Sequence, residues 1–129
     1  MPPSTTRNYL MDKGYNAAVA LVKYRAVKFS AAETVTPTTA VNDLIAGVVQ
    51  HDVATLEIAK GKGASIAVEG ATLWEASEAI PIGSPISIVA DGRCAVAVAT
   101  EQTHGICVEA AVGAGDYARV ELQINNRVA

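Results

Sequence analysis

The chain has 129 residues, of which half are hydrophobic but only 5% are aromatic, and its formal net charge is −3. This length suffices for one domain with its own core, and the shortage of aromatic rings means that Val, Ile, Leu and Ala must fill most of it. The slightly acidic balance argues against nucleic acid as a partner, because a phosphate backbone requires clustered Lys and Arg. No apolar run reaches the roughly 20 residues of a membrane-spanning helix, so no membrane partner is expected.

Residues 1–16 are predicted to form an extended N-terminal arm. The segment is polar and contains two prolines and a glycine, so it has too little apolar surface to fold alone. It also lacks the apolar run of a signal peptide, and we expect synthesis in the cytoplasm. In that reducing compartment Cys94 and Cys107 are expected to be buried thiols rather than a disulfide.

Residues 17–129 are predicted to form a single all-β domain, a small barrel or sandwich with at most one short helix. Residues 17–29 fit both the periodicity of a helix and that of a strand, and we interpret them as a strand. The Thr-rich stretch 30–44 is expected to be extended chain with turns. Beyond it, short apolar runs are separated by Gly, Pro, Asp and Asn, as is typical of all-β folds. The expected runs are 45–50, 53–60, 64–70, 86–89, 94–100, 105–111 and 117–124, with turns at 61–63, 91–92 and 113–115.

The segment 71–79, ATLWEASEA, fits either a short helix or a loop, and we expect it to cross the barrel. Trp74 in this segment is the only tryptophan of the chain. It is either a core residue or an anchor in a protein interface, where tryptophan is enriched.

Two parts of the chain resemble each other, because the order of glycines and apolar residues in 47–68 is repeated in 105–122. Gly-Val-Val, two glycines and Ile-Ala-Val in the first part parallel Gly-Ile-Cys, two glycines and Val-Glu-Leu in the second. We expect two similar hairpins that face each other across one barrel, although two copies are too few to define a repeat architecture.

No group of residues meets the requirements of a catalytic or metal site. His51 is followed by Asp52, but neighbouring side chains on a strand point to opposite faces, and His104 is read as an ordinary loop residue. The histidines and cysteines lack the paired spacing of a zinc site. The chain is therefore not predicted to be an enzyme, and no cofactor is expected.

Two further patterns are read as ordinary surface structure. The Lys-Gly-Lys-Gly run at 60–63 has the composition of a phosphate loop, but a strand rather than a helix is predicted to follow it. Glu75 and Glu78 could serve as the acid and base of a glycosidase, yet nothing else marks a sugar cleft, and nearby carboxylates are common on solvated loops.

Several strings occur in an order that suggests a family. These are Asn8-Tyr9 with Gly14, DLIAGVVQ at 43–50, KGKGASIAVEG at 60–70, AIPIGSPISIVADGR at 79–93 and HGICVEAAVGAGDYARVEL at 104–122. In this order the chain resembles the small capsid decoration proteins, also called cement proteins, of tailed bacteriophages. The string VKYRAVKF at 22–29 departs from the pattern, because it lacks the glycine turn expected before the first Val strand.

The resemblance implies a β-barrel of the β-tulip type that forms homotrimers on the outer surface of an expanded phage head, with the major capsid protein as partner. The arm is then expected to lie on the capsid, with Arg7, Asn8, Tyr9 and Leu10 as contact residues. The alternative is a carbohydrate-binding or host-surface-binding module displayed on the virion. A trimeric β-barrel nucleotide hydrolase comes third, because no acidic and glycine-rich site motif is present.

Overall fold

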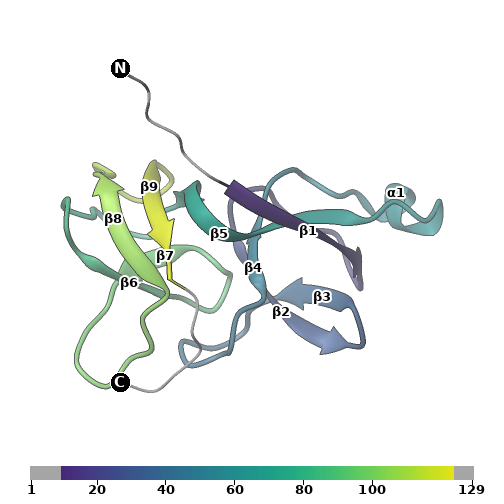
Figure 1. Cartoon of the computed structure of the whole chain (residues 1–129), viewed down its shortest axis with the longest axis horizontal. Coiled ribbons are helices and arrows are strands. Elements are labelled where there is room, and N and C mark those ends of the chain that lie inside the picture. Colours follow the sequence, from purple (N-terminus) through teal and green to yellow (C-terminus); the bar gives the residue numbers. More distant parts are fainter. Residues whose placement is uncertain (1–9, 124–129) are drawn as a thin grey trace.

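The computed structural model describes residues 10–123, and this part of the chain is almost entirely β-structure (Figure 1), which confirms the all-β fold class. The elements in chain order are β1 (Leu10–Ala17), β2 (Ala26–Ala31), β3 (Thr34–Pro37), β4 (Gly47–Val49), α1 (Thr55–Ala59), β5 (Ala64–Glu75), β6 (Pro85–Ile88), β7 (Cys94–Val96), β8 (Gly105–Glu109) and β9 (Tyr117–Leu122).

The first five strands close into a barrel. Their order is β1-β3-β2-β4-β5, and an antiparallel pairing of β5 with β1 closes the ring. The sequence analysis placed residues 10–16 in an irregular arm, but they belong to β1, which runs along β5 from the Leu10↔Gly70 pair to the Tyr15↔Ala64 pair. Backbone hydrogen bonds to β5 hold this polar segment without a large apolar surface of its own. Residues 1–9 lie outside the described residues, and their role as an arm remains a prediction.

The remaining strands form a second ring that shares β5 with the first. From β5 the order is β9, β8, β6 and β7, and β7 returns to the end of β5 through the parallel bridge Ala76↔Cys94. The predicted hairpins β6–β7 and β8–β9 are confirmed as antiparallel pairs. Figure 1 shows β6 to β9 on one side of the molecule and β1 to β4 on the other, joined by the long strand β5. The two similar hairpins thus belong to two fused barrels and do not face each other across one barrel.

The two barrels repeat one structural unit. Each of the five strand pairings in the first barrel recurs in the second with the same direction, and the unit's first and third strands are parallel in both. The register also recurs, because the pair Ala17↔Val35 corresponds to Ala76↔Cys94 and the pair Val27↔Gly47 corresponds to Ile86↔Gly105. Strand β5 is therefore the last strand of the first unit and the first strand of the second.

The residues buried inside the two barrels lie at equivalent positions of the two units. Leu21, Val27, Val49 and Ile66 are buried in the first barrel, and their counterparts Ile80, Ile86, Cys107 and Val120 are buried in the second. Helix α1 lies between β4 and β5 of the first unit, whereas a turn connects β8 to β9 in the second.

Other predictions of local structure are also wrong. Residues 17–29, expected to be one strand, contain the end of β1 and the start of β2, and the residues between Ala17 and Ala26 belong to neither. The run 53–60, expected to be a strand, contains α1, whose Glu57 carboxylate accepts a hydrogen bond from the N–H of Ala54 at 2.9 Å. The segment 71–75, expected to cross the barrel, continues β5, because it pairs with β9. The last of these outcomes has a non-local cause, since pairing with β9 decides where β5 ends.

Candidate functional site

His51 and Asp52 do not form an orienting pair. The Oδ1 atom of Asp52 accepts a hydrogen bond from the N–H of Lys23 at 2.8 Å, and Nε2 of His51 accepts one from the N–H of Ser65 at 3.2 Å. Because a backbone amide can only donate, the His51 proton lies on Nδ1, which is 3.1 Å from the carbonyl oxygen of Asp52. The Asp52 side chain therefore holds the backbone at Lys23, and the His51 side chain holds the backbone of β5 at Ser65.

His104 lies directly before β8 and outside any strand, as the sequence suggested, but it is buried and not an ordinary surface residue. It is fully buried in the second barrel, and neither ring nitrogen has a hydrogen-bond partner among the described residues. Burial lowers the pKa of His104 to about 4, so the ring is neutral at pH 7. Ala46 occupies the equivalent place in the first barrel, as the bonds Ala46 N–H to Val27 O and His104 N–H to Ile86 O show.

The carboxylates of Glu75 and Glu78 have separate structural partners. Glu75 accepts hydrogen bonds from Nε and Nη2 of Arg25 at 3.0 and 3.3 Å, and Glu78 accepts one from the N–H of Val96 at 3.0 Å. Glu78 and Glu101 line a shallow hollow of about 490 Å³ beside β6 and β7. One oxygen of the Glu101 carboxylate, Oε1, accepts hydrogen bonds from the hydroxyl of Ser87 and the N–H of Val98, so both acids of this hollow have structural partners.

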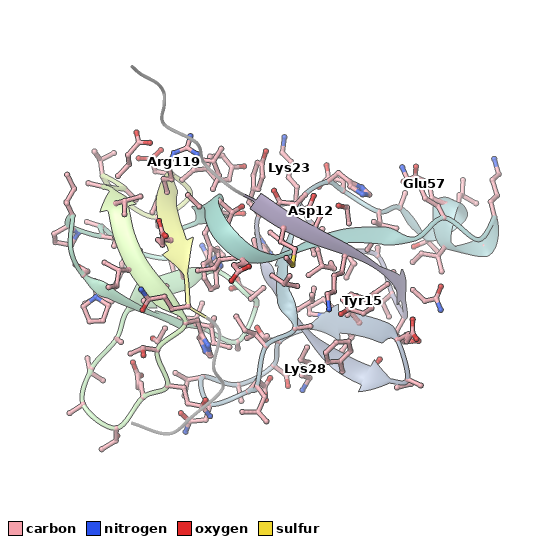
Figure 2. The ribbon with its side chains drawn as sticks, viewed as in Figure 1. Asp12, Tyr15, Lys23, Lys28, Glu57 and Arg119 are labelled. Atoms are coloured by element: carbon pink, nitrogen blue, oxygen red, sulfur yellow. The ribbon has the colours of Figure 1, made fainter. Side chains whose placement is uncertain are left out.

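The run 60–63 forms the turn between α1 and β5. A strand follows it from Ala64, as predicted, and Nζ of Lys62 pairs with the Glu57 carboxylate at 2.7 Å. The turn therefore lacks the helix N-terminus that would complete a phosphate site. Figure 2 shows that Glu57 and Arg119 lie far apart, on different barrels, and the labelled charged side chains do not converge on one place.

The two cysteines are free and buried in the second barrel. Burial raises the pKa of the Cys94 thiol to about 12, which keeps it protonated. Within residues 10–123, no group of three or more His, Cys, Asp or Glu side chains is placed to hold a metal ion. Nor does this part of the chain contain a helix of the length and apolarity needed to cross a membrane.

The residues predicted to contact partners fall into two groups. Trp74 is fully buried, and its Nε1–H donates to the carbonyl oxygen of Gly92 at 2.9 Å, so it offers no ring surface to a partner in this conformation. Residues 7–9 lie outside the described residues, and Leu10 begins β1, where its backbone pairs with β5. The expected contact of Arg7, Asn8, Tyr9 and Leu10 with a capsid remains a prediction.

Exposed apolar side chains gather on the outer side of the second barrel. Ile106 and Val108 of β8 are 40% and 41% exposed, and Pro85 of β6 is the exposed partner of Ile106. We call these three residues the outer apolar face. The exposed Glu121 of β9 is the other cross-strand partner of Ile106, so this apolar surface is small and has a carboxylate beside it. Sequence reasoning missed it, because the alternation in β8 does not tell which side faces the interior.

The fold defines the class of this protein: two five-stranded β-barrels fused through a shared strand, with an exposed apolar face and no catalytic constellation among residues 10–123. No family model and no curated protein matches the chain. The structure is similar to the crystal structure of the head fiber gp8.5 N base in bacteriophage phi29, with a TM-score of 0.66 and 18% sequence identity. The match covers 94% of this chain and 98% of that chain, and at this identity it establishes the shared fold.

Proposed function

We propose that the chain is a structural protein of a phage virion that binds the outer surface of the expanded head as a homotrimer and stabilises it. The similarity to the head fiber N base of bacteriophage phi29, over nearly the whole of both chains, is the observation that carries the proposal. The order of the sequence motifs supports it separately, because it resembles the capsid decoration proteins. The major capsid protein is the proposed partner.

The role of a head-stabilising protein makes few chemical demands on the chain. A protein that stabilises a head needs no catalysis, only contacts that bind the assembled lattice better than free subunits. Three chains in a trimer supply three attachment points, so weak single contacts combine through effective concentration. The N-terminal residues are proposed to add to this binding by contacting the capsid, where main-chain hydrogen bonds would supply affinity.

Co-sedimentation with heads tests the proposal. Purified protein is mixed with expanded, decoration-free phage heads and, in parallel, with unexpanded proheads. We expect the protein to sediment with expanded heads and to saturate them near one trimer for each local three-fold position. Protein that stays in the supernatant with both kinds of particle would contradict the proposal.

A deletion separates the role of the N-terminal segment from that of the barrels. Removing residues 2–9 leaves β1 and both barrels in place, and we expect it to abolish head binding without lowering the melting temperature. Removing residues 124–129 is the matched control, and it should bind as the full chain does. Unimpaired binding by the 2–9 deletion would refute the arm contact while leaving head binding itself intact.

A further inference from the structure

A pocket of about 200 Å³ lies where the two barrels meet. Its lining comes from the chain between β1 and β2 with the start of β2, from the end of β3, and from the tip of the β6–β7 hairpin. Leu21, Ala26 and Val27 are buried and form its closed end, whereas Ala20 and Ala90 are exposed and lie at its rim. Most of the lining is therefore aliphatic, and its alanines leave the space open.

The hairpin tip that lines the pocket is fixed to the first barrel at both of its ends. At one end the Thr38 hydroxyl donates a hydrogen bond to the carbonyl oxygen of Val89 at 3.3 Å. At the other end the N–H of Ala26 donates to the carbonyl oxygen of Gly92 at 2.8 Å. The pocket is therefore formed without a ligand, as binding sites for small molecules usually are.

Arg25 and Asp91 supply the charged side chains of the pocket lining. The Arg25 guanidinium donates from Nε and Nη2 to the Glu75 carboxylate at 3.0 and 3.3 Å, and the Asp91 carboxylate accepts from the N–H and Nε of Arg93 at 3.2 and 2.9 Å. The hydrogen bond to Glu75 raises the pKa of Arg25, and the charge of Asp91 also raises it, so the two lining groups lie close enough to interact. Because each charge has an opposite charge beside it, the pocket favours an uncharged ligand.

Both charged groups of the lining keep unused capacity for hydrogen bonds. A guanidinium carries more N–H donors, and a carboxylate more acceptor sites, than these ion pairs use. Nη1 of Arg25 has no partner among residues 10–123, and each oxygen of Asp91 accepts one bond from Arg93. A carboxamide, which both accepts and donates, matches this pair of groups, whereas Asp91 would repel an anion and Arg25 a cation.

The main chain directly before Arg25 has an uncommon conformation. Tyr24 has a φ of 61°, in the left-handed region that bulky residues rarely adopt. Its N–H donates to the carbonyl oxygen of Val49 at 2.6 Å, and its own carbonyl oxygen accepts from the N–H of Glu75 at 2.8 Å, so neighbouring strands enforce this conformation. Enforced backbone strain is concentrated at functional sites, and here it lies beside the charged end of the pocket.

We propose that the pocket binds a small uncharged amide, with an apolar body the size of one aromatic ring against Leu21 and Val27 and with the amide group between Arg25 and Asp91. An apolar cavity of about 150 Å³ is enough to hold benzene. Sites for drug-sized ligands begin at about 300 Å³, so the volume of this pocket, about 200 Å³, sets the size of the ligand. The inference goes beyond the proposed function and does not rest on it, because binding is measured on the purified chain.

Titration of the isotope-labelled chain with benzamide, followed by two-dimensional NMR, tests the site. We expect an affinity in the millimolar range, as is usual for a ligand of about nine non-hydrogen atoms, with shifts centred on the backbone amides of Leu21, Ala26 and Ala90. Toluene, benzoate and benzylamine carry the same ring without the amide, and each should bind at least about tenfold more weakly. Equal binding by any of the three would overturn the assignment of an uncharged amide.

Substitutions in the lining show whether the shifts come from this pocket. Ala20→Leu and Ala90→Leu each fill it from a different wall and should abolish benzamide binding, whereas Ala114→Leu, at an exposed alanine in the turn before β9, should bind as the unaltered chain does. Arg25→Lys should weaken benzamide about tenfold and leave toluene unchanged, because the ammonium group is occupied by Glu75. Melting curves confirm that each variant is folded. The proposal is overturned if benzamide causes no shifts, if both filled variants still bind it, or if Arg25→Lys weakens both ligands equally.

Discussion

Val48 and Ile106 occupy the same register position in two equivalent barrels, yet Val48 is fully buried and Ile106 is 40% exposed. The difference comes from the neighbour, because the second barrel covers Val48 and no part of the described chain covers Ile106 to the same extent. In proteins built from repeated units, a terminal unit normally carries a polar outer face that keeps it soluble. The second barrel of this chain combines both kinds of residue there, because Ile106 is apolar and Glu121, the counterpart of the buried Ala67, is charged and exposed.

The glycines that begin β4 and β8 allow close strand packing. A Cβ at Gly47 would collide with the backbone oxygen of Ala67, and one at Gly105 would collide with that of Glu121. We expect Gly47→Ala and Gly105→Ala each to lower the free energy of unfolding by about 1–3 kcal/mol, as overpacked cores do. Urea denaturation measures this, with Gly113→Ala as control, since a Cβ there meets nothing within 4 Å. Equal stability of all three variants would contradict the close packing.

Stability is predicted to depend on pH through His104. Its pKa is about 4 in the folded chain, below the ordinary value of 6.5, because burial disfavours the charged ring. The unfolded chain therefore binds more protons between these values, so stability is highest above pH 6.5 and falls as the pH drops toward 4. The loss across this window is about 3 kcal/mol at most.

A substitution isolates the His104 effect. His104→Leu removes the titrating group and should flatten the dependence of the free energy of unfolding on pH between 6.5 and 4. Gly113→Ala is the control, because it changes no titratable group and should leave that slope unchanged. An unchanged slope in His104→Leu would show that other groups cause the dependence.

The fluorescence of Trp74 is predicted to report on the folding of the second barrel. Its emission should be blue-shifted in the folded chain and shift to the red on unfolding, because the ring is fully buried. Trp74→Phe removes the hydrogen bond to Gly92 and should cost about 1–2 kcal/mol, whereas Trp74→Ala should cost about 3–5 kcal/mol. Tyr15→Phe, at the equivalent place of the first barrel, is the control with a smaller effect. Red-shifted emission from the folded chain would contradict the burial.

The ion pair between Arg25 and Glu75 is predicted to stabilise the chain more than a surface pair does. The half-buried guanidinium of Arg25 donates two hydrogen bonds to the carboxylate of Glu75 in β5. A lysine at position 25 could not make this two-pronged contact, because its ammonium group is a single point of charge. A double-mutant cycle should give a coupling free energy of about 1 kcal/mol, less at high salt. The exposed pair of Lys62 and Glu57 is the control and should show no measurable coupling. Equal coupling in both cycles would contradict this ranking.

Much of the fold could be predicted from local patterns. The Asp-Gly turn before Cys94 and the glycines at 113–115 mark hairpins that the structure confirms, because turn chemistry acts over a few residues. The resemblance between 47–68 and 105–122 correctly indicates two similar hairpins. Their assignment to one barrel is wrong, because no local signal reveals that β5 serves two rings.

The predictions about strands and site residues that failed concern features that depend on contacts between residues far apart in the sequence. Residues 10–16 are polar, and only their pairing with β5 makes them a strand. For Trp74, the sequence allows both a buried and an exposed ring, and the choice depends on which side of β5 faces the second barrel. The outer apolar face was missed for the same reason, because Ile106 and its counterpart Val48 look alike in the sequence.

Electron cryo-microscopy of expanded phage heads incubated with the purified protein tests the central claim most directly. We expect additional density on the outer surface at three-fold and quasi-three-fold positions, with a shape that accommodates the two fused barrels of each chain. Heads that show the same bare surface with and without saturating protein would contradict the assignment to the capsid exterior.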